Sequence, residues 1–215
     1  GTASVAPIVI PRRAEVHDWL RESGGSSAVR RLELGESDYR RSEETWLEAG
    51  MPTATILLAA TPTELGVQVE ARVGSPRFVP RERENPFDNE AADIDGDSMQ
   101  LYFASGFAPT GQDAEGWVLV PEGDGGVRVR SIAGHAGTVQ PVADWRSIDG
   151  GYALRIRLPL RALQGRAGEP GFRLGLVVNH TRPGRLRRAG QLVLGGASGE
   201  WIYLRGDRHR VHRLV

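Results

Sequence analysis

The chain has 215 residues, a formal net charge of zero at pH 7 and no cysteine. Zero net charge provides no basic footprint for nucleic acid, and the absence of cysteine excludes disulfides, thiol catalysis and cysteine-ligated metals. All 27 basic residues are arginine, so no lysine is present to act as a Schiff base or a general base. No apolar run approaches the roughly 18 residues that cross a membrane. The length suits one β-sandwich domain.

The first 28 residues are predicted to form an extension that serves as a linker or a docking segment. Residues 12–22 place several apolar side chains on one face and are predicted to form a short helix, which ends at the Gly-Gly-Ser-Ser stretch 24–27. The remaining residues, 29–215, are predicted to form a single β-sandwich domain. We expect this domain to be a module of a longer polypeptide.

Strand patterns dominate from residue 29 onward. Residues 54–60 form a continuous apolar run that is typical of a buried strand, and residues 65–73 and 152–158 alternate between apolar and polar side chains. Pro159 then predicts one helical turn, because proline is tolerated in the first turn of a helix. Further strands are predicted over 29–34, 98–103, 117–120, 127–132, 138–145, 172–179, 191–194, 201–204 and 210–215. Short strands joined by Gly, Pro, Asp and Asn predict an all-β, antiparallel and jelly-roll-like sandwich.

A dense acidic loop precedes the strand predicted at 98–103. Five carboxylates lie between Asp88 and Asp97, and such crowding is unfavourable unless a cation or arginine compensates it. One hypothesis is that Asp93, Asp95 and Asp97 bind Ca²⁺, although the loop lacks the glycine and the closing glutamate of an EF-hand. The alternative is pairing of these acids with Arg77, Arg81, Arg83 or the arginines between 182 and 188. The sequence leaves both open.

Several aromatic and polar residues are candidates for ligand contacts. Flat rings stack on the C–H faces of sugars, and Trp201, Trp46 and Phe87 all lie in or beside polar, loop-like segments. Large aromatics more often anchor a core, which is the competing interpretation for each of them. Residues 179–188 contain an asparagine, a histidine and four arginines, which can read hydroxyls or anions or neutralise the acidic loop.

No catalytic motif is apparent. The five histidines lack metal-ligand spacing, since a pair three residues apart on a strand points to opposite faces. There is no nucleophile elbow and no phosphate-binding loop. A glycosidase-type carboxylate pair stays open, because the separation of two carboxylates is a property of the folded chain.

From about residue 29 to the end, the chain resembles the family 9 carbohydrate-binding modules and their DOMON-like relatives. The resemblance rests on the order of five segments. These are the central strand Glu64–Ala71, the Asp-Ser strand Asp97–Phe103 after an Asp-rich loop, the strand and proline turn Gly151–Leu160, the late strand Phe172–Asn179, and the closing segment Gly190–Gly196 followed by Trp201.

The resemblance implies an antiparallel β-sandwich that holds a sugar between two aromatic rings, with Ca²⁺ in structural sites. On this basis the expected ligand-binding residues are Trp201, Phe87, Asn179, Arg188, Gln100 and Trp46. Gln100 stands where the family commonly has a carboxylate. Some relatives bind haem through a methionine and a histidine, here Met99 and His180. Met99 shares a face with Leu101, so it is predicted to fill the core and haem is not expected.

The sequence therefore predicts a non-catalytic carbohydrate-binding module, appended to a glycan-active protein such as a xylanase and secreted or periplasmic in bacteria. Its expected partners are an oligo- or polysaccharide and a catalytic domain of the same polypeptide, with no nucleic acid and no membrane. The alternative is a structural domain that packs on a parent enzyme without binding sugar. A glycan-active enzyme is a third hypothesis.

Overall fold

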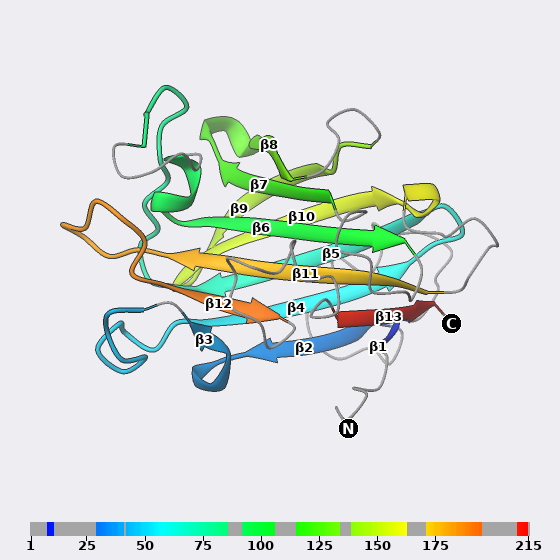
Figure 1. Cartoon of the computed structure of the whole chain (residues 1–215), viewed down its shortest axis with the longest axis horizontal. Coiled ribbons are helices and arrows are strands. Elements are labelled where there is room, and N and C mark those ends of the chain that lie inside the picture. Colours follow the sequence, from blue (N-terminus) through cyan, green and yellow to red (C-terminus); the bar gives the residue numbers. More distant parts are fainter. Residues whose placement is uncertain are drawn as a thin grey trace.

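The computed structural model describes residues 8–10, 29–40, 42–85, 92–105, 115–133, 139–162, 171–194 and 210–214. These residues form two β-sheets that pack face to face (Figure 1). None of the helices in these segments is long and apolar enough to cross a membrane. The predicted β-sandwich is confirmed. The helix predicted over 12–22 and the strand predicted over 201–204 lie outside the described residues.

The larger sheet contains eight of the described strands. Its order is β1-β13-β11-β6-β7-β8, and β12 and then β3 extend it beside β11. The strands are β1 (Ile8–Ile10), β3 (Tyr39–Arg40), β6 (Ser98–Ser105), β7 (Glu115–Pro121), β8 (Val127–Ala133), β11 (Gly171–His180), β12 (Gly190–Leu194) and β13 (Arg210–Leu214). β1 runs parallel to β13, whereas the other pairs are antiparallel. β1 falls within the predicted extension 1–28, so this part of the extension belongs to the sheet.

The smaller sheet has the order β2-β4-β5-β10-β9 and is antiparallel throughout. Its strands are β2 (Arg30–Leu34), β4 (Thr53–Ala60), β5 (Glu64–Arg72), β10 (Gly151–Pro159) and β9 (Val142–Ile148). The connections include the 3₁₀ turns η1 (Glu36–Asp38), η2 (Ala92–Asp95), η3 (Gly123–Gly125) and η4 (Leu160–Ala162). η4 follows Pro159, as the sequence predicts. β9 begins at Val142, later than the predicted strand 138–145.

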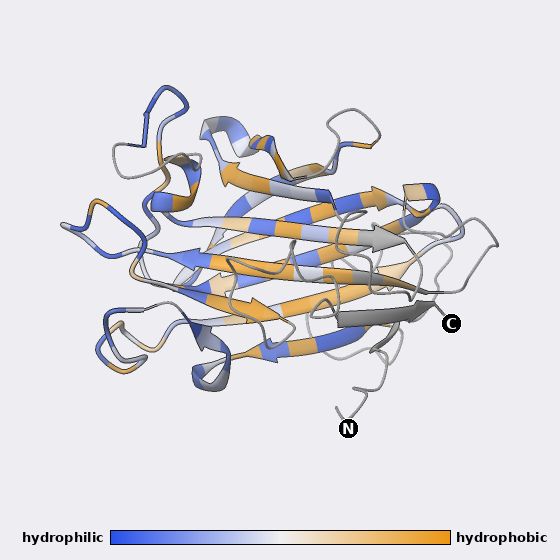
Figure 2. Ribbon diagram, viewed as in Figure 1, coloured by the Kyte–Doolittle hydropathy of each residue, from blue (hydrophilic) through white to orange (hydrophobic). Residues whose placement is uncertain are grey.

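The core lies between the sheets and follows the period-two pattern of the strands. Val67 and Val69 of β5 are completely buried and belong to one cluster with Leu101 and Met99 of β6. Figure 2 shows the resulting alternation of apolar and polar residues along several strands. Because side chains on one strand point alternately to the two faces, the opposite face of β6 and β11 carries polar residues beside a small cluster of Tyr102, Val177 and Val193. Met99 is in the core, as predicted.

β4 is buried on both faces, which explains its continuous apolar sequence. Ile56 and Leu58 point into the core, while Leu57 and Ala59 form a second buried cluster on the outer face. A strand that is covered on both faces needs apolar side chains at every position.

The two ends of the sandwich differ in their chemistry. We call the end where β6 begins and β11 ends the His180 end, and the end where β5 begins and β10 ends the Arg157 end. They lie at opposite ends of the long direction of the sheets (Figure 1). η2 and the 181–189 turn lie at the His180 end, and η4 lies at the Arg157 end.

Candidate ligand-binding site

The outer face of the larger sheet carries a connected set of amide side chains near the His180 end. The Asn179 side chain donates to Ser98 Oγ at 2.9 Å and to Gln100 Oε1 at 3.0 Å. Gln191 Nε2 donates to Asn179 Oδ1 at 2.7 Å, and Gln100 Nε2 donates to the Tyr102 hydroxyl at 2.7 Å. We call these five residues the amide network.

Strand register brings the amide network together. Asn179 of β11 lies opposite Ser98 of β6 on one side and opposite Gln191 of β12 on the other. Gln100 follows two residues after Ser98, so it points to the same face. Met99 and Val178 alternate with these residues and point into the core. The same alternation that builds the core therefore aligns the polar groups.

The amide network is buried and almost completely hydrogen-bonded. Asn179 is fully buried and Gln100 is 6% exposed. Unpaired buried polar groups each cost about 1–3 kcal/mol, so the mutual pairing fixes the orientation of every amide. Gln191 Oε1 is the exception, since it has no hydrogen-bond partner among the described residues. This oxygen can accept a hydrogen bond, and no described residue donates one to it.

A pocket of about 410 Å³ lies where the 181–189 turn leads into β12. Its lining comes from Glu43 and from residues 185–189, namely Arg185, Leu186, Arg187, Arg188 and Ala189. Ala189 N donates to His180 O at 2.6 Å, which fixes the end of the turn against β11. The volume is within the roughly 300–1,000 Å³ of small-molecule sites, and the lining is rich in hydrogen-bond donors.

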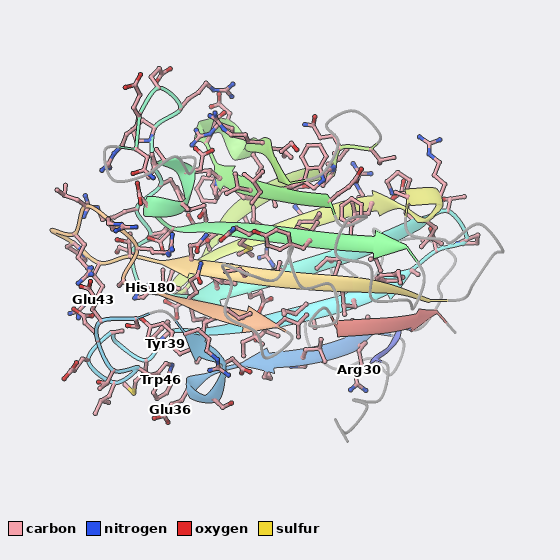
Figure 3. All side chains as sticks on the ribbon, viewed as in Figure 1. Arg30, Glu36, Tyr39, Glu43, Trp46 and His180 are labelled. Carbon is pink, nitrogen blue, oxygen red and sulfur yellow. The ribbon has the colours of Figure 1, made fainter. Side chains whose placement is uncertain are left out.

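Ion pairs hold the two walls of this pocket together. Arg182 Nη1 lies 2.9 Å from the Glu44 carboxylate, and Arg185 Nη2 lies 3.1 Å from the Glu43 carboxylate. Arg182 and Arg185 therefore neutralise acids of the 42–50 segment. Figure 3 shows Glu43, Tyr39, Trp46 and His180 gathered at this end of the molecule.

Tyr39 is an aromatic residue of this end that the sequence analysis did not single out. A Cβ placed on Gly190 would meet the Tyr39 hydroxyl at 2.3 Å, so the ring packs directly on the first residue of β12. Burial raises the pKa of Tyr39 above its ordinary value, and a hydrogen bond with Ser42 opposes that shift. The glycine at position 190 indicates that another group packs closely there, but the sequence does not show that this group is Tyr39.

The structure describes the acidic loop from Ala92 onward, and Asp88 and Glu90 lie outside the described residues. Arg128 Nη2 lies 2.8 Å from Asp93 Oδ1, and Arg130 Nε lies 2.8 Å from Asp93 Oδ2. Arginine pairing is confirmed for Asp93, but the partners come from β8 rather than from the arginines that the sequence analysis named. Arg81 pairs instead with Glu122, and the hydrogen bonds that Arg81 and Arg128 donate lower the pKa of Glu122.

The trio Asp93, Asp95 and Asp97 does not fit a calcium ion as a ligand set. Asp93 is occupied by two guanidinium groups, and the described residues contain no group of three histidine or acidic side chains that could hold a metal. Asp97 accepts a hydrogen bond from Arg77 N at 2.7 Å. Whether the chain binds calcium stays a prediction.

His180 and Asp97 form a second buried polar pair just inside the sandwich. His180 Nδ1 lies 3.8 Å from Asp97 Oδ1, and the other ring nitrogen lies 3.1 Å from Ala49 O. The Tyr152 hydroxyl is also buried and has no partner among the described residues. Burial, followed by the charge of Asp97, raises the pKa of Tyr152 well above its ordinary value.

The structure brings together some of the predicted ligand-binding residues. Gln100 and Asn179 are hydrogen-bonded to each other, and Arg188 lines the adjacent pocket and is 9% exposed. Trp46 is half-buried in the segment that contributes Glu43, and its indole N–H donates to Pro52 O at 2.8 Å. Trp201 and Phe87 lie outside the described residues. Gln191 was missed because a lone glutamine in a short strand has no distinctive pattern.

Comparisons with known proteins support the fold. No protein-family model and no curated protein matches the chain. A family 9 carbohydrate-binding module from Caldicellulosiruptor kristjanssonii, solved with cellotriose, is similar at a TM-score of 0.66 and 11% identity, covering 97% of this chain and 93% of that one. Its glucose complex gives a TM-score of 0.65 at 12% identity, with 98% and 96% covered.

A predicted carbohydrate-binding protein from Bacteroides uniformis is similar at a TM-score of 0.55 and 10% identity, covering 97% of this chain and 99% of that one. All three likenesses extend over nearly the full length of both chains, so the resemblance that the sequence suggests is confirmed at the level of the fold. The chain has the β-sandwich fold of the family 9 carbohydrate-binding modules.

Proposed function

We propose that the domain binds a neutral saccharide at the His180 end, in the pocket beside the amide network. The observation that carries this proposal is the oriented network of Gln100, Asn179 and Gln191, two residues along the chain from a pocket of about 410 Å³ whose lining ends at Ala189. Sugar hydroxyls both donate and accept, so a saccharide needs fixed amides and guanidinium groups of this kind. The two Caldicellulosiruptor structures, solved with cellotriose and with glucose, support the choice of ligand.

Arg188 and Gln191 are assigned to the hydroxyls, and Gln100 and Asn179 hold Gln191 in orientation. Trp201 is assigned to stacking on the sugar ring, with Trp46 or Phe87 as the second ring. The domain is proposed to be an accessory module of a secreted or periplasmic glycan-active protein, in which it would bring a catalytic domain of the same polypeptide to its substrate.

Isothermal titration calorimetry with glucose and cellotriose tests the proposal. We expect saturable binding, and we expect Gln191→Leu to weaken it about tenfold, the size of one lost hydrogen bond of about 1.4 kcal/mol. Gln68→Leu is the matched control, because Gln68 is an equally buried amide on the outer face of the smaller sheet. Trp201→Ala should abolish binding if that ring stacks on the sugar.

The outcomes separate the parts of the proposal. If wild type, Gln191→Leu and Trp201→Ala bind the sugars with equal affinity, the sugar site does not lie at the His180 end. No binding of either sugar, with and without Ca²⁺, would favour the structural alternative. Leu47, Met51 and Leu186 are large apolar side chains at least half exposed at the His180 end, and they would then be the contact surface for a parent protein.

A further inference from the structure

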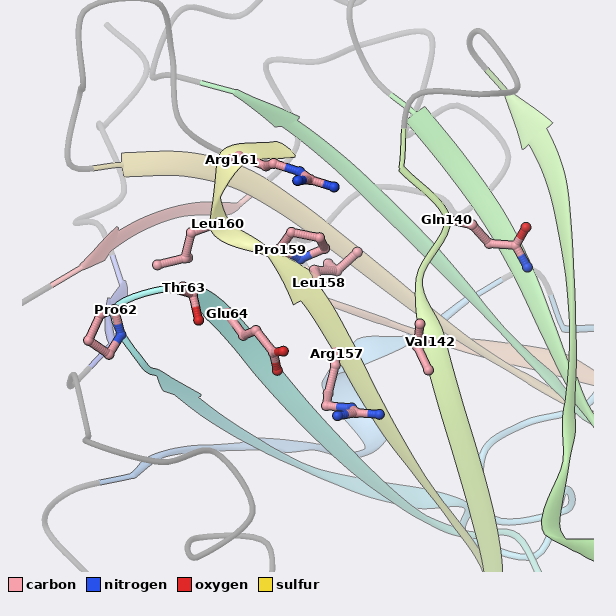
Figure 4. A pocket seen from close by; sticks show the side chains of 10 residues that line it. All are labelled: Pro62, Thr63, Glu64, Gln140, Val142, Arg157, Leu158, Pro159, Leu160 and Arg161. Carbon is pink, nitrogen blue, oxygen red and sulfur yellow. The ribbon is translucent and has the colours of Figure 1, made fainter.

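A second pocket lies at the Arg157 end, away from the amide network. Its volume is about 560 Å³, and its walls come from the turn between β4 and β5, from the end of β10 with η4, and from the start of β9. Pro159 and Val142 supply accessible apolar side chains, which we call the apolar floor, and Figure 4 shows Arg157 beside one part of the pocket and Arg161 beside another. Glu64, which lies beside Arg157 in Figure 4, and Gln140 also line the pocket.

The walls of this pocket are held by short backbone hydrogen bonds. Leu160 N donates to Thr63 O at 2.9 Å, which ties η4 to the β4–β5 turn. Within that turn, Thr61 N donates to Glu64 O at 2.8 Å and Glu64 N donates to Thr61 Oγ1 at 2.9 Å. Because these hydrogen bonds hold the backbone of the pocket in place, a ligand loses little binding free energy to ordering the walls.

The guanidinium groups of this pocket are available for a ligand. Arg155, two residues before Arg157 on the same face, pairs with Asp144 at 2.9 Å. By contrast, neither Arg157 nor Arg161 has a hydrogen bond or an ion pair within the segments that the structure describes. Both side chains are exposed, so each can present its planar donors to a ligand oxygen pair.

The charge and shape of the pocket select the class of ligand. Two guanidinium groups and the Glu64 carboxylate leave one net positive charge, which matches a carboxylate better than a dianion such as phosphate. Thr63, Gln140 and Glu64 add groups that can bind hydroxyls, and the apolar floor suits the C–H face of a sugar ring. We propose that this pocket is a second binding site, for a saccharide that carries a carboxylate, such as a uronate.

This inference does not depend on the proposed neutral-sugar site, because the two pockets share no residue. In the pocket, a guanidinium group holds the carboxylate and the ring lies on Pro159 and Val142. Since both arginines are exposed, the interaction is screened by salt, and we expect dissociation constants of ~1 mM that rise with ionic strength.

Calorimetric titration with glucuronate and with tri-galacturonate tests the proposal. We expect saturable binding, weakened about tenfold or more in Arg157→Gln or Arg161→Gln and abolished in the double variant, as loss of a charge-assisted hydrogen bond predicts. Arg146→Gln is the matched control, because Arg146 is an exposed arginine on β9 outside the pocket and its replacement changes the net charge equally. It should leave the affinity unchanged.

Further arms of the same experiment identify what is recognised. Acetate and sulfate should bind much more weakly than glucuronate, because neither offers a ring to the apolar floor. Equal binding of these small anions would overturn the saccharide assignment, and uronate binding that survives both arginine substitutions would overturn the location. Absence of uronate binding would overturn the proposal altogether.

The same variants keep the two pockets distinguishable. Gln191→Leu should weaken glucose and leave glucuronate unchanged, and Arg157→Gln should do the reverse. If glucose does not bind but glucuronate binding depends on Arg157, the neutral-sugar proposal fails and this one stands.

Discussion

Arg128 links three segments through one buried guanidinium group. The side chain is 6% exposed and donates to Asp93 Oδ1 at 2.8 Å, to Val79 O at 2.7 Å and to Glu122 Oε1 at 2.9 Å. It thereby fixes η2, and with it the loop that leads into β6 and the amide network. A buried charge of this kind is tolerated because its partners replace the water that it lost.

Replacing Arg128 should therefore lower the free energy of unfolding much more than replacing Arg130, which is exposed. We expect Arg128→Met to lower the free energy of unfolding by about 3 kcal/mol, because it leaves a buried carboxylate with less compensation. Arg130→Met removes a partner that is 47% exposed, and it should cost less than about 1 kcal/mol. Urea denaturation measures both, and equal losses would contradict this account.

The partner of Asp93 illustrates what local sequence cannot predict. The sequence indicates that the acids need compensation, but Arg128 is 35 residues away from Asp93. It arrives only because β8 pairs with β7 at the edge of the sheet. The nearby Arg77 contributes its backbone N–H, not its guanidinium group, to Asp97.

Gly151 shows how closely neighbouring strands approach at the start of β10. A Cβ at this position would lie 1.8 Å from Ala71 O of β5, and that oxygen belongs to the backbone and cannot move alone. Gly150, just before it, has φ of +76°, a conformation that glycine adopts without strain. The Asp149-Gly150 turn therefore joins β9 to β10, and Gly151 allows the close approach of β10 to β5.

Gly151→Ala should separate β10 from β5 at this point. We expect a loss of about 2–3 kcal/mol in the free energy of unfolding, typical of overpacking in a buried site. Gly123→Ala is the control, since no atom lies within 4 Å of its added Cβ, and it should stay within about 0.5 kcal/mol of wild type. Thermal denaturation compares the two, and a similar melting temperature for both variants would count against the assigned register.

Strands with strong local patterns were predicted well, and strands defined by their neighbours were not. β4, β5 and β10 follow from apolar runs and alternation, and their observed bounds are close to those expected. β3 has two residues and exists because it pairs with β12, and β1 exists because it pairs with β13. Such pairing depends on the folded chain, so no local pattern signals it.

At the scale of the whole molecule, the sandwich separates two chemically different ends. The His180 end joins buried amides to a pocket rimmed by Arg–Glu pairs, and the Arg157 end presents guanidinium groups without such pairs in the described segments. The net charge of zero is a sum over the whole chain, so it does not indicate that the two ends differ. The order of five segments was enough to predict the fold, because order along the chain determines which strands are neighbours.

The candidate site was only partly predictable from the same information. Asn179 and Gln100 could be named because they match positions in a recognised strand order. Gln191 and Tyr39 could not, since their roles depend on the register of β12 against β11 and on the contact between Tyr39 and Gly190. Register is set by packing across strands that are distant in sequence.

The most direct test of the central claim is to map sugar binding by the backbone amide NMR shifts of the intact domain during a cellotriose titration. We predict saturable shifts concentrated at Ser98, Gln100, Asn179 and Gln191 and in the 181–189 turn, with little change along β2, β4 and β5. No saturable shifts, or shifts confined to the smaller sheet, would contradict the account.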